Sequence, residues 1–143
     1  MDSEGLIYEM AGIDGCLTAD AGHDAHYYGE RHCYIDCRGP LSIHPASYFG
    51  FGVKVITASH DLSTWPQLGK MILRPVVIDE GAWIASFAIL FNCHIGEHAI
   101  VSFGAVVNGL NVPPWAVVTG NPAKIIGRMK NGVIIPWTMD EES

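Results

Sequence analysis

Residues 74–108 read RPVVIDEGAWIASFAILFNCHIGEHAIVSFGAVVN, and large aliphatic side chains recur in this stretch at a fixed interval. Six residues separate the members of two series: Ile72, Ile78, Ile84 and Leu90, and then Ile95, Val101 and Val107. An amphipathic helix needs apolar residues three or four apart, and a half-buried strand needs alternation, so neither explains an interval of six. A parallel β-helix explains it, because each flat face of its coil takes one hexapeptide with the large residue pointing inward.

The same interval extends upstream and is interrupted twice. Ile43, Phe49 and Val55 are six residues apart, but the next member of the pattern, Ile72, follows Val55 only after 17 residues. Within this interval, residues 60–70 are mostly polar and include Pro and Gly, so they predict a loop outside the coil at about 60–71. The second slip, from Leu90 to Ile95, is one residue short. A β-sandwich is the competing prediction, but it requires alternation and a turn every 8–12 residues, which fit less well.

The limits of the repeat define the expected organisation of one domain, since 143 residues leave room for one core. The β-helix is predicted over 33–122, after an N-terminal segment, 1–32, in which no six-residue interval appears. The repeat stops at Thr-Gly-Asn-Pro (119–122). Residues 123–130 are predicted to form a short closing helix, and 131–143 an acidic tail.

Composition and charge exclude several classes of protein. The net charge is −7, with seven acids and no Lys or Arg in residues 1–30, and all eight bases between 31 and 130. These acidic ends argue against nucleic-acid binding, whereas the more basic middle permits a small anionic ligand. No apolar run approaches the ~20 residues that span a bilayer, and no secretory signal is visible, so we expect a cytoplasmic protein without membrane insertion. The four cysteines form no CxxC pair, and no compact zinc pattern occurs.

Three stretches resemble the hexapeptide-repeat acyltransferases, and are most similar to the galactoside, serine and colanic-acid acetyltransferases and the xenobiotic acetyltransferases. They are YIDCRGPLSIHPASYFGFGVKVITASHD (34–61), the stretch quoted above, and VPPWAVVTGNPAKIIGR (112–128). The resemblance implies a left-handed parallel β-helix that works as a homotrimer. It also implies an acyl-CoA donor, usually acetyl-CoA, and a site in the cleft between neighbouring subunits.

His60 is the predicted catalytic residue. Transfer of an acetyl group to an alcohol needs a base that removes the hydroxyl proton, and a neutral imidazole suits this near pH 7. His60 stands at the start of the predicted loop, and by resemblance it matches the catalytic histidine of the family. Its alternative is an ordinary surface histidine.

The resemblance also implies residues that contact the two substrates. Acceptor contacts are predicted at Asp36, Asp61 and Trp65, and cofactor contacts at Trp83, Ala85, Gly104, Asn121, Pro122, Lys124 and Arg128. The alternative role for Asp36 is that of a structural residue at a corner of the coil. The alternative for Asp61 is an exposed acid in the loop. Trp83 has the alternative of a subunit-interface aromatic. The bases near the end of the coil suit nucleotide phosphates, or are simply solvated charges.

The sequence therefore predicts an acetyl-CoA-dependent transferase that O-acetylates a sugar or polysaccharide unit by direct transfer, with no metal. One alternative is a xenobiotic acetyltransferase acting on an antibiotic. Another is a metalloenzyme like the γ-class carbonic anhydrases, which use three zinc-binding histidines, although two of those positions fall on Ser86 and Phe91 here. A non-catalytic β-helix scaffold is the third.

Overall fold

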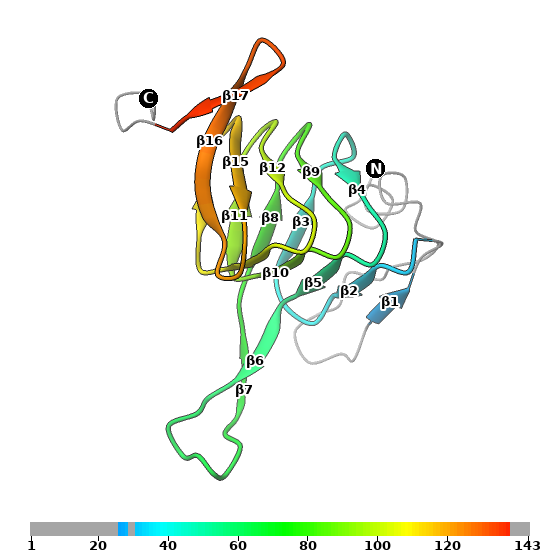
Figure 1. The fold of residues 1–143 in the computed structure, drawn as a ribbon. Helices are drawn as coiled ribbons and strands as arrows, with labels where there is room; N and C mark the ends of the chain where they lie inside the picture. The colour runs from blue at the N-terminus through cyan, green and yellow to red at the C-terminus, as the bar shows by residue number, and fades with distance from the viewer. Residues whose placement is uncertain (1–25, 29–30, 138–143) are drawn as a thin grey trace.

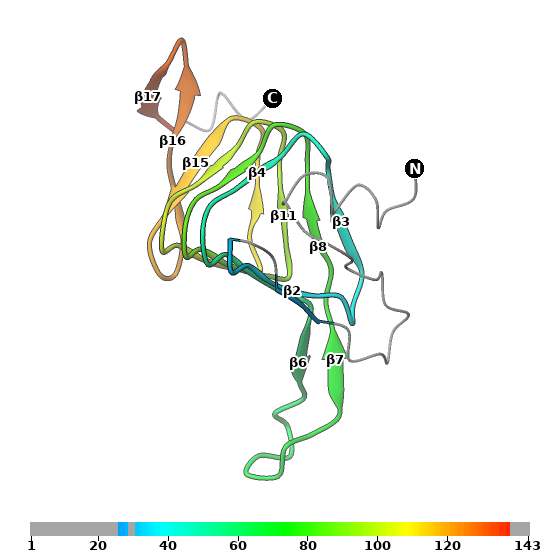
Figure 2. The same cartoon turned by 90° about the vertical axis from the view of Figure 1, so that its right-hand side faces the viewer.

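The computed structural model of the chain describes residues 26–28 and 31–137, in which all regular structure is β-strand (Figure 1). Its short parallel strands wind as a left-handed β-helix of four coils with a triangular cross-section, seen along the axis in Figure 2. The predicted fold class is thus confirmed. No helix long and apolar enough to cross a membrane occurs among these residues.

Each coil contributes one strand to each of three parallel sheets, here called A, B and C. Sheet A contains β2 (Tyr34–Asp36), β5 (Lys54–Ile56), β10 (Ile89–Phe91) and β13 (Val106–Asn108). Sheet B contains β3 (Leu41–Ile43), β8 (Val76–Ile78), β11 (Cys93–Ile95) and β14 (Asn111–Val112). Sheet C contains β4 (Tyr48–Phe49), β9 (Trp83–Ile84), β12 (Ile100–Val101) and β15 (Ala116–Thr119).

The core consists of three columns of inward-pointing side chains, one column for each sheet. They are Ile35, Val55, Leu90 and Val107 in sheet A; Ile43, Ile78, Ile95 and Val112 in sheet B; and Phe49, Ile84, Val101 and Val118 in sheet C. None is more than 3% exposed. Full burial of one such side chain contributes about 1.5–3 kcal/mol. The six-residue interval therefore marks the inward position of each face.

All variation in coil length falls at the corner between sheets A and B, the A–B corner. From the inward residue of sheet A to that of sheet B the four coils take eight, 23, five and five residues. The passages from B to C and from C to A take six residues in every case. Insertions at the A–B corner leave the other two corners in register. The coils therefore stack in the same way despite their different lengths.

The long insertion is an antiparallel hairpin, here called the excursion hairpin. It comprises β6 (Ala58–His60), β7 (Met71–Leu73) and the connecting residues 61–70. Both views show it projecting away from the coils (Figures 1 and 2). Ile72 lies on β7 opposite Ser59 and not on a coil, so the assignment of Ile72 to the six-residue series was wrong. Its distance from Ile78 matched the repeat by coincidence.

Antiparallel strands cover both ends of the solenoid. At one end β1 (His26–Tyr28) pairs with β2, and at the other β16 (Lys124–Lys130) and β17 (Val133–Pro136) extend sheet C beyond β15. The predicted helix at 123–130 is therefore wrong. The last coil leaves an edge of unpaired backbone N–H and C=O groups, and pairing with that edge favours strand over helix. Gly127 permits the pairing, since a Cβ there would collide with the carbonyl oxygen of Ile135.

Candidate active site

His60 ends the first strand of the excursion hairpin and is half-buried. Its Nδ1 lies 2.9 Å from the carbonyl oxygen of Gly69, across the hairpin. A carbonyl oxygen only accepts hydrogen bonds, so in the neutral ring Nδ1 carries the proton and Nε2 keeps its lone pair. This arrangement leaves Nε2 able to accept a proton from a substrate.

A short network of backbone hydrogen bonds shapes the turn that holds His60. The amide of Asp61 donates to the carbonyl of Lys70 (2.9 Å), and that of Gly69 donates to the carbonyl of Asp61 (3.0 Å). The Asp61 carboxylate accepts from the amide of Ser63 (2.9 Å), and hydrogen bonds from Ser63 lower the pKa of Asp61. The carboxylate of Asp61 thus folds the loop locally.

Gly69 contacts His60, and the sequence did not predict this contact. A Cβ at this position would collide with the backbone oxygen of Asp61, so the close approach of the backbone at Gly69 to that at Asp61 requires glycine. The available signal was one Gly inside a polar loop, which predicts a turn but not a contact with His60.

Asp36 lies at the A–B corner, directly beneath the start of the excursion hairpin, and has no exposed surface. Arg38 donates to both of its oxygens (2.8 and 3.0 Å), and the amide of Thr57 donates to Oδ2 (3.1 Å). Burial raises the pKa of Asp36, but these hydrogen bonds outweigh it and bring the pKa below the ordinary 3.8. This enclosure favours the corner role over acceptor contact. Trp65, by contrast, lies in the hairpin loop and is exposed.

The structure brings most of the predicted cofactor residues to the corner between sheets C and A, the C–A corner. Trp83 and Ala85 line a hollow of about 500 Å³ there. The amide of Gly104, in the next coil, donates to the carbonyl of Ser86 at the same corner (3.0 Å). The turn after β15 contains Asn121 and Pro122, and it leads into β16 at Lys124. Lys124 is exposed and pairs with Thr119 at the end of β15.

Arg128 does not join this group. It pairs with Ala116, at the opposite end of β15 from Lys124, and so lies toward the corner between sheets B and C. His60 is separated from the group as well. The strands of sheet A enter from the C–A corner and leave at the A–B corner, from which the excursion hairpin departs (Figure 2). One six-residue face spans roughly 20 Å in extended chain. His60 and the predicted donor residues thus occupy opposite edges of sheet A within one chain.

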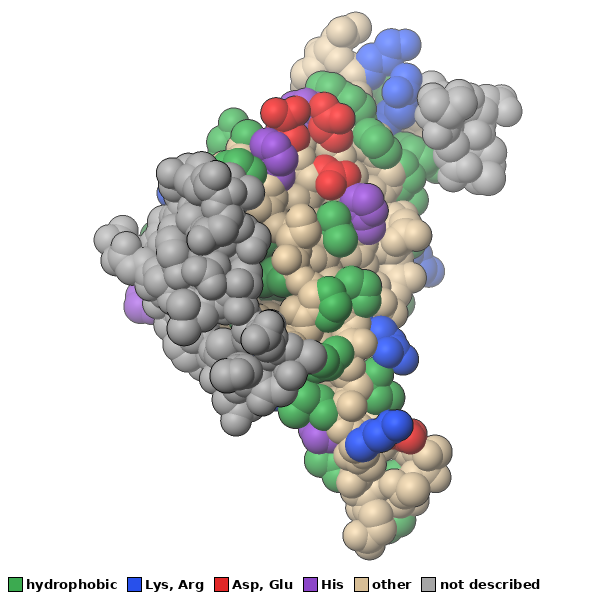
Figure 3. Space-filling view, turned by 180° about the vertical axis from the view of Figure 1, so that it is seen from behind, with side chains coloured by type: hydrophobic (Ala, Val, Ile, Leu, Met, Phe, Trp, Pro, Cys, Tyr) green, Lys and Arg blue, Asp and Glu red, His purple; other side chains and the backbone are tan. Residues whose placement is uncertain are grey.

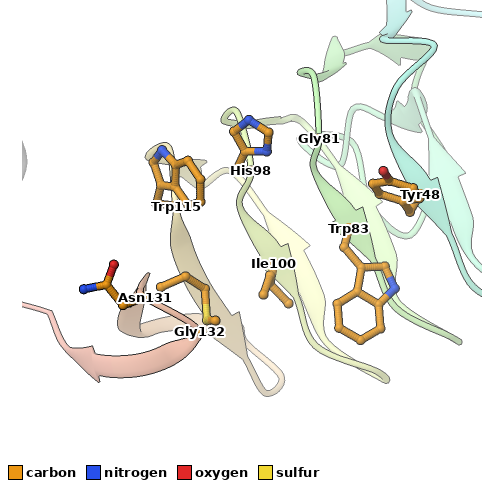
Figure 4. Close-up of a pocket in the computed structure, with 9 residues that line it drawn as sticks. Tyr48, Gly81, Trp83, His98, Ile100, Trp115, Asn131 and Gly132 are labelled. Atoms are coloured by element: carbon orange, nitrogen blue, oxygen red, sulfur yellow. The ribbon is translucent and has the colours of Figure 1, made fainter.

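A second hollow, of about 580 Å³, lies on the outer face of sheet C (Figure 4). Tyr48, Trp83 and Ile100 come from three neighbouring strands of that sheet and line it. Its rim includes His98 and Trp115, whose ring centroids are 4.5 Å apart, and Asn131 at the turn between β16 and β17. Trp83 therefore borders both hollows.

Acidic and histidine side chains gather on the face seen in Figure 3. His94 and Asp79 form an exposed pair with Nε2 and Oδ2 2.7 Å apart. Glu80, Glu97 and His98 offer ligand atoms within 4.8 Å of one another, the one such group in the described part of the chain. All three reach solvent, and none lies on the excursion hairpin.

The chain is similar to several acetyltransferases of known sequence or structure. No family model matches the chain. Nodulation protein L of Rhizobium meliloti is 37% identical over 104 residues, covering 72% of this chain and 57% of that protein. A hexapeptide-repeat acetyltransferase from Vibrio cholerae, crystallised with acetyl-CoA, is 26% identical with a TM-score of 0.58, covering 69% of this chain and 55% of that one.

A maltose O-acetyltransferase from Clostridium difficile shares the fold, with a TM-score of 0.57 and 24% identity, over 64% of this chain and 49% of that one. The chain spans a little over half the length of the curated relatives it matches.

Proposed function

Because this chain belongs to the hexapeptide-repeat, left-handed β-helix acyltransferases, we propose that it transfers an acetyl group from acetyl-CoA to a hydroxyl of a sugar or polysaccharide unit. The observation that carries the proposal is the hydrogen bond of His60, whose Nδ1 is held by the carbonyl of Gly69, so that Nε2 keeps its lone pair and can act as a base. The saccharide acceptor is supported by the activity named for the maltose O-acetyltransferase of the same fold.

In the proposed reaction, Nε2 of His60 takes the proton of the acceptor hydroxyl as its oxygen attacks the carbonyl carbon of the thioester. A C–O bond forms and the C–S bond breaks. The protonated imidazole then returns its proton to the departing thiolate, giving CoA and the acetyl ester. A backbone N–H near the thioester stabilises the tetrahedral oxyanion. Holding acceptor and donor together supplies much of the rate, because it converts an encounter of two molecules into a reaction within one complex.

The separation of His60 from the donor residues supports a site shared between subunits. The loop of the excursion hairpin exposes apolar side chains, among them Leu62, Trp65 and Leu68, which a neighbouring chain can cover. If the hairpin of one subunit lies against the C–A corner of the next, His60 meets the group that contains Trp83, Ala85 and Gly104. We therefore propose a homotrimer, the assembly that the family resemblance implies.

A calorimetric titration of the purified protein with acetyl-CoA tests this proposal. Saturable binding near one donor per subunit is expected, followed by acceptor-dependent release of free thiol when oligosaccharides are supplied. Chloramphenicol serves as the competing acceptor for the xenobiotic alternative. Absence of binding up to millimolar acetyl-CoA would overturn the proposal and favour a non-catalytic scaffold.

A further inference from the structure

The hollow at the C–A corner is unusually aromatic for a surface feature of a small domain. Its lining includes five exposed aromatic side chains: Tyr48, Phe51, Trp83, Phe87 and Phe103. Phe87 and Phe103 are 64% and 79% exposed, respectively. Contiguous exposed apolar surface on a soluble domain generally marks a place where something binds.

Two polar groups that border this hollow are engaged within the protein. The hydroxyl of Ser86 accepts a hydrogen bond from the amide of Phe51 (3.0 Å), and the guanidinium of Arg31 donates to the carbonyl of Phe49. The remaining surface of the hollow consists mainly of ring carbon and of Ala85. Such a surface suits a hydrocarbon chain better than a sugar, whose hydroxyls would lose their hydrogen bonds to water without replacement.

Phe87 lines this hollow although its backbone conformation is unfavourable for a bulky residue. Its φ is +65°, and the equivalent corner residues of the two adjacent coils are glycines, Gly52 at +67° and Gly104 at +72°. A bulky side chain in this region costs of order 1 kcal/mol. A Cβ on Gly52 would lie 2.6 Å from Cδ1 of Phe87, so the ring packs directly over that glycine. Since the ring is mostly exposed, core packing does not account for the strain.

We propose that this hollow binds the acyl chain of a donor longer than acetyl, so that the thioester used by this protein extends to medium-chain acyl-CoA. The inference rests on the proposed function, because Trp83 and Ala85 line the hollow and are also predicted to contact the donor. An acetyl group carries a single methyl beyond its carbonyl and leaves most of a space of about 500 Å³ unfilled. A longer chain covers the rings of Phe51, Phe87 and Phe103.

The test is the affinity of the full-length protein for CoA, acetyl-CoA, butanoyl-CoA, hexanoyl-CoA and octanoyl-CoA, measured by calorimetry. Each fully buried methylene tightens binding by about four-fold. Hexanoyl-CoA, whose chain is only partly enclosed, is expected to bind at least about ten-fold more tightly than acetyl-CoA. Affinity should level off once the chain leaves the hollow.

Two variants remove rings from the hollow, and one serves as a control. Phe87→Gly and Phe103→Ala each remove apolar contact with the acyl chain. Each should reduce the ratio of the affinity for hexanoyl-CoA to that for acetyl-CoA by at least about five-fold. Their affinity for CoA itself should stay unchanged. Trp115→Ala removes an exposed ring that lies outside this hollow, and should leave the whole series as in the wild type.

The outcomes separate this inference from the proposed function. Binding of CoA and acetyl-CoA with no gain for longer chains overturns the inference and leaves acetyl transfer standing. A gain that persists in both ring variants also overturns it, since the chain would then lie elsewhere. A flat series combined with a changed oligomeric state in Phe103→Ala assigns the hollow to a second copy of the chain, contrary to the inference. Failure of every thioester and of CoA to bind removes the proposed function itself.

Discussion

The proposed role of His60 depends on one hydrogen bond, from its Nδ1 to the carbonyl of Gly69, because that bond selects the nitrogen left free to act as base. The histidine could be predicted from the sequence because it stands in a family-like segment next to a break in the repeat. Its partner Gly69 could not, since nine residues separate the two and only the folded hairpin brings them together. The surroundings of Asp36 could not be predicted from the sequence either, because its burial and its hydrogen bond from the amide of Thr57 depend on the stacking of two coils.

Replacing His60 with Ala should lower turnover by at least about 100-fold, because general-base catalysis is typically this large. The affinity for acetyl-CoA should change little, since the residues predicted to contact the donor lie at another corner of the chain. Single-turnover kinetics and calorimetry on the same preparation measure the two quantities. Unchanged turnover would show that another group removes the proton.

Asp36→Asn should destabilise the protein by about 2 kcal/mol, because it weakens charge-assisted hydrogen bonds in a buried corner. The pKa of Asp36 is lowered in the folded state, so its contribution to stability is fully present above the ordinary value of 3.8 and is lost as pH falls below it. Denaturant unfolding between pH 6 and pH 3 measures this. The loss of unfolding free energy as the pH is lowered should be smaller in the variant than in the wild type. Equal losses would contradict a stabilising role for the Asp36 carboxylate.

Among the elements, the excursion hairpin and the end of the solenoid show what periodicity can and cannot predict. The interval of six identified the three faces because every inward position requires a large apolar residue. It also misassigned Ile72, which matches the interval while lying on β7. At 123–130, the local sequence allowed a helix, and the unpaired edge of β15 decided for a strand. An edge of that kind is a property of the assembled sheet.

Gly69→Ala should lower kcat by about ten-fold or more, because the added Cβ displaces the loop segment whose carbonyl holds His60, and small misplacements near the chemistry are costly. The affinity for acetyl-CoA and the thermal stability should stay near wild type, since the hairpin lies outside the core. Lys70→Ala, at the neighbouring exposed position, is the matched control and should retain full kcat. Equal losses in both variants would point to general disruption of the hairpin.

The C–A corner offers a test of strain. Phe87→Gly should raise the free energy of unfolding by about 1 kcal/mol, because glycine accepts a φ of +65° without penalty. Phe103→Gly is the comparison, since Phe103 is exposed at the same corner without a positive φ, and it should lower stability by about 0.5–1 kcal/mol. Urea unfolding of the wild type, Phe87→Gly and Phe103→Gly measures the three free energies of unfolding. A loss of stability in Phe87→Gly would mean that its ring packs more favourably than its backbone suggests.

For the whole molecule, the central question is whether the site is complete within one chain. His60 lies at the A–B corner and Trp83 lies on sheet C beside the C–A corner. No local motif reveals that separation, because each residue matches its own family segment. The prediction of a shared site therefore came from the resemblance, and the geometry of the single chain supports it independently.

Mixing two inactive variants tests the shared site. His60→Ala and Trp83→Ala should each be severely impaired alone, the first in chemistry and the second in donor binding. Refolded together in equal amounts, they should recover about a quarter of wild-type activity, because random assembly of a cyclic trimer makes one in four interfaces wild type at both positions. Activity no greater than that of the separate variants would show that each chain carries its own complete site.

The confinement of all length variation to the A–B corner has a consequence for how this scaffold can change. Eight, 23, five and five residues bridge the same two sheets, and the apolar columns continue undisturbed. Residues can be inserted at the A–B corner of any coil without changing the packing of the core. The cost is small, because the closure entropy of a surface loop grows only slowly with its length. The excursion hairpin of the second coil is an insertion at this corner. Two further positions at the same corner, beside Asn92 and Gly109 in the next two coils, can accept an inserted loop on the same side of the solenoid as the excursion hairpin.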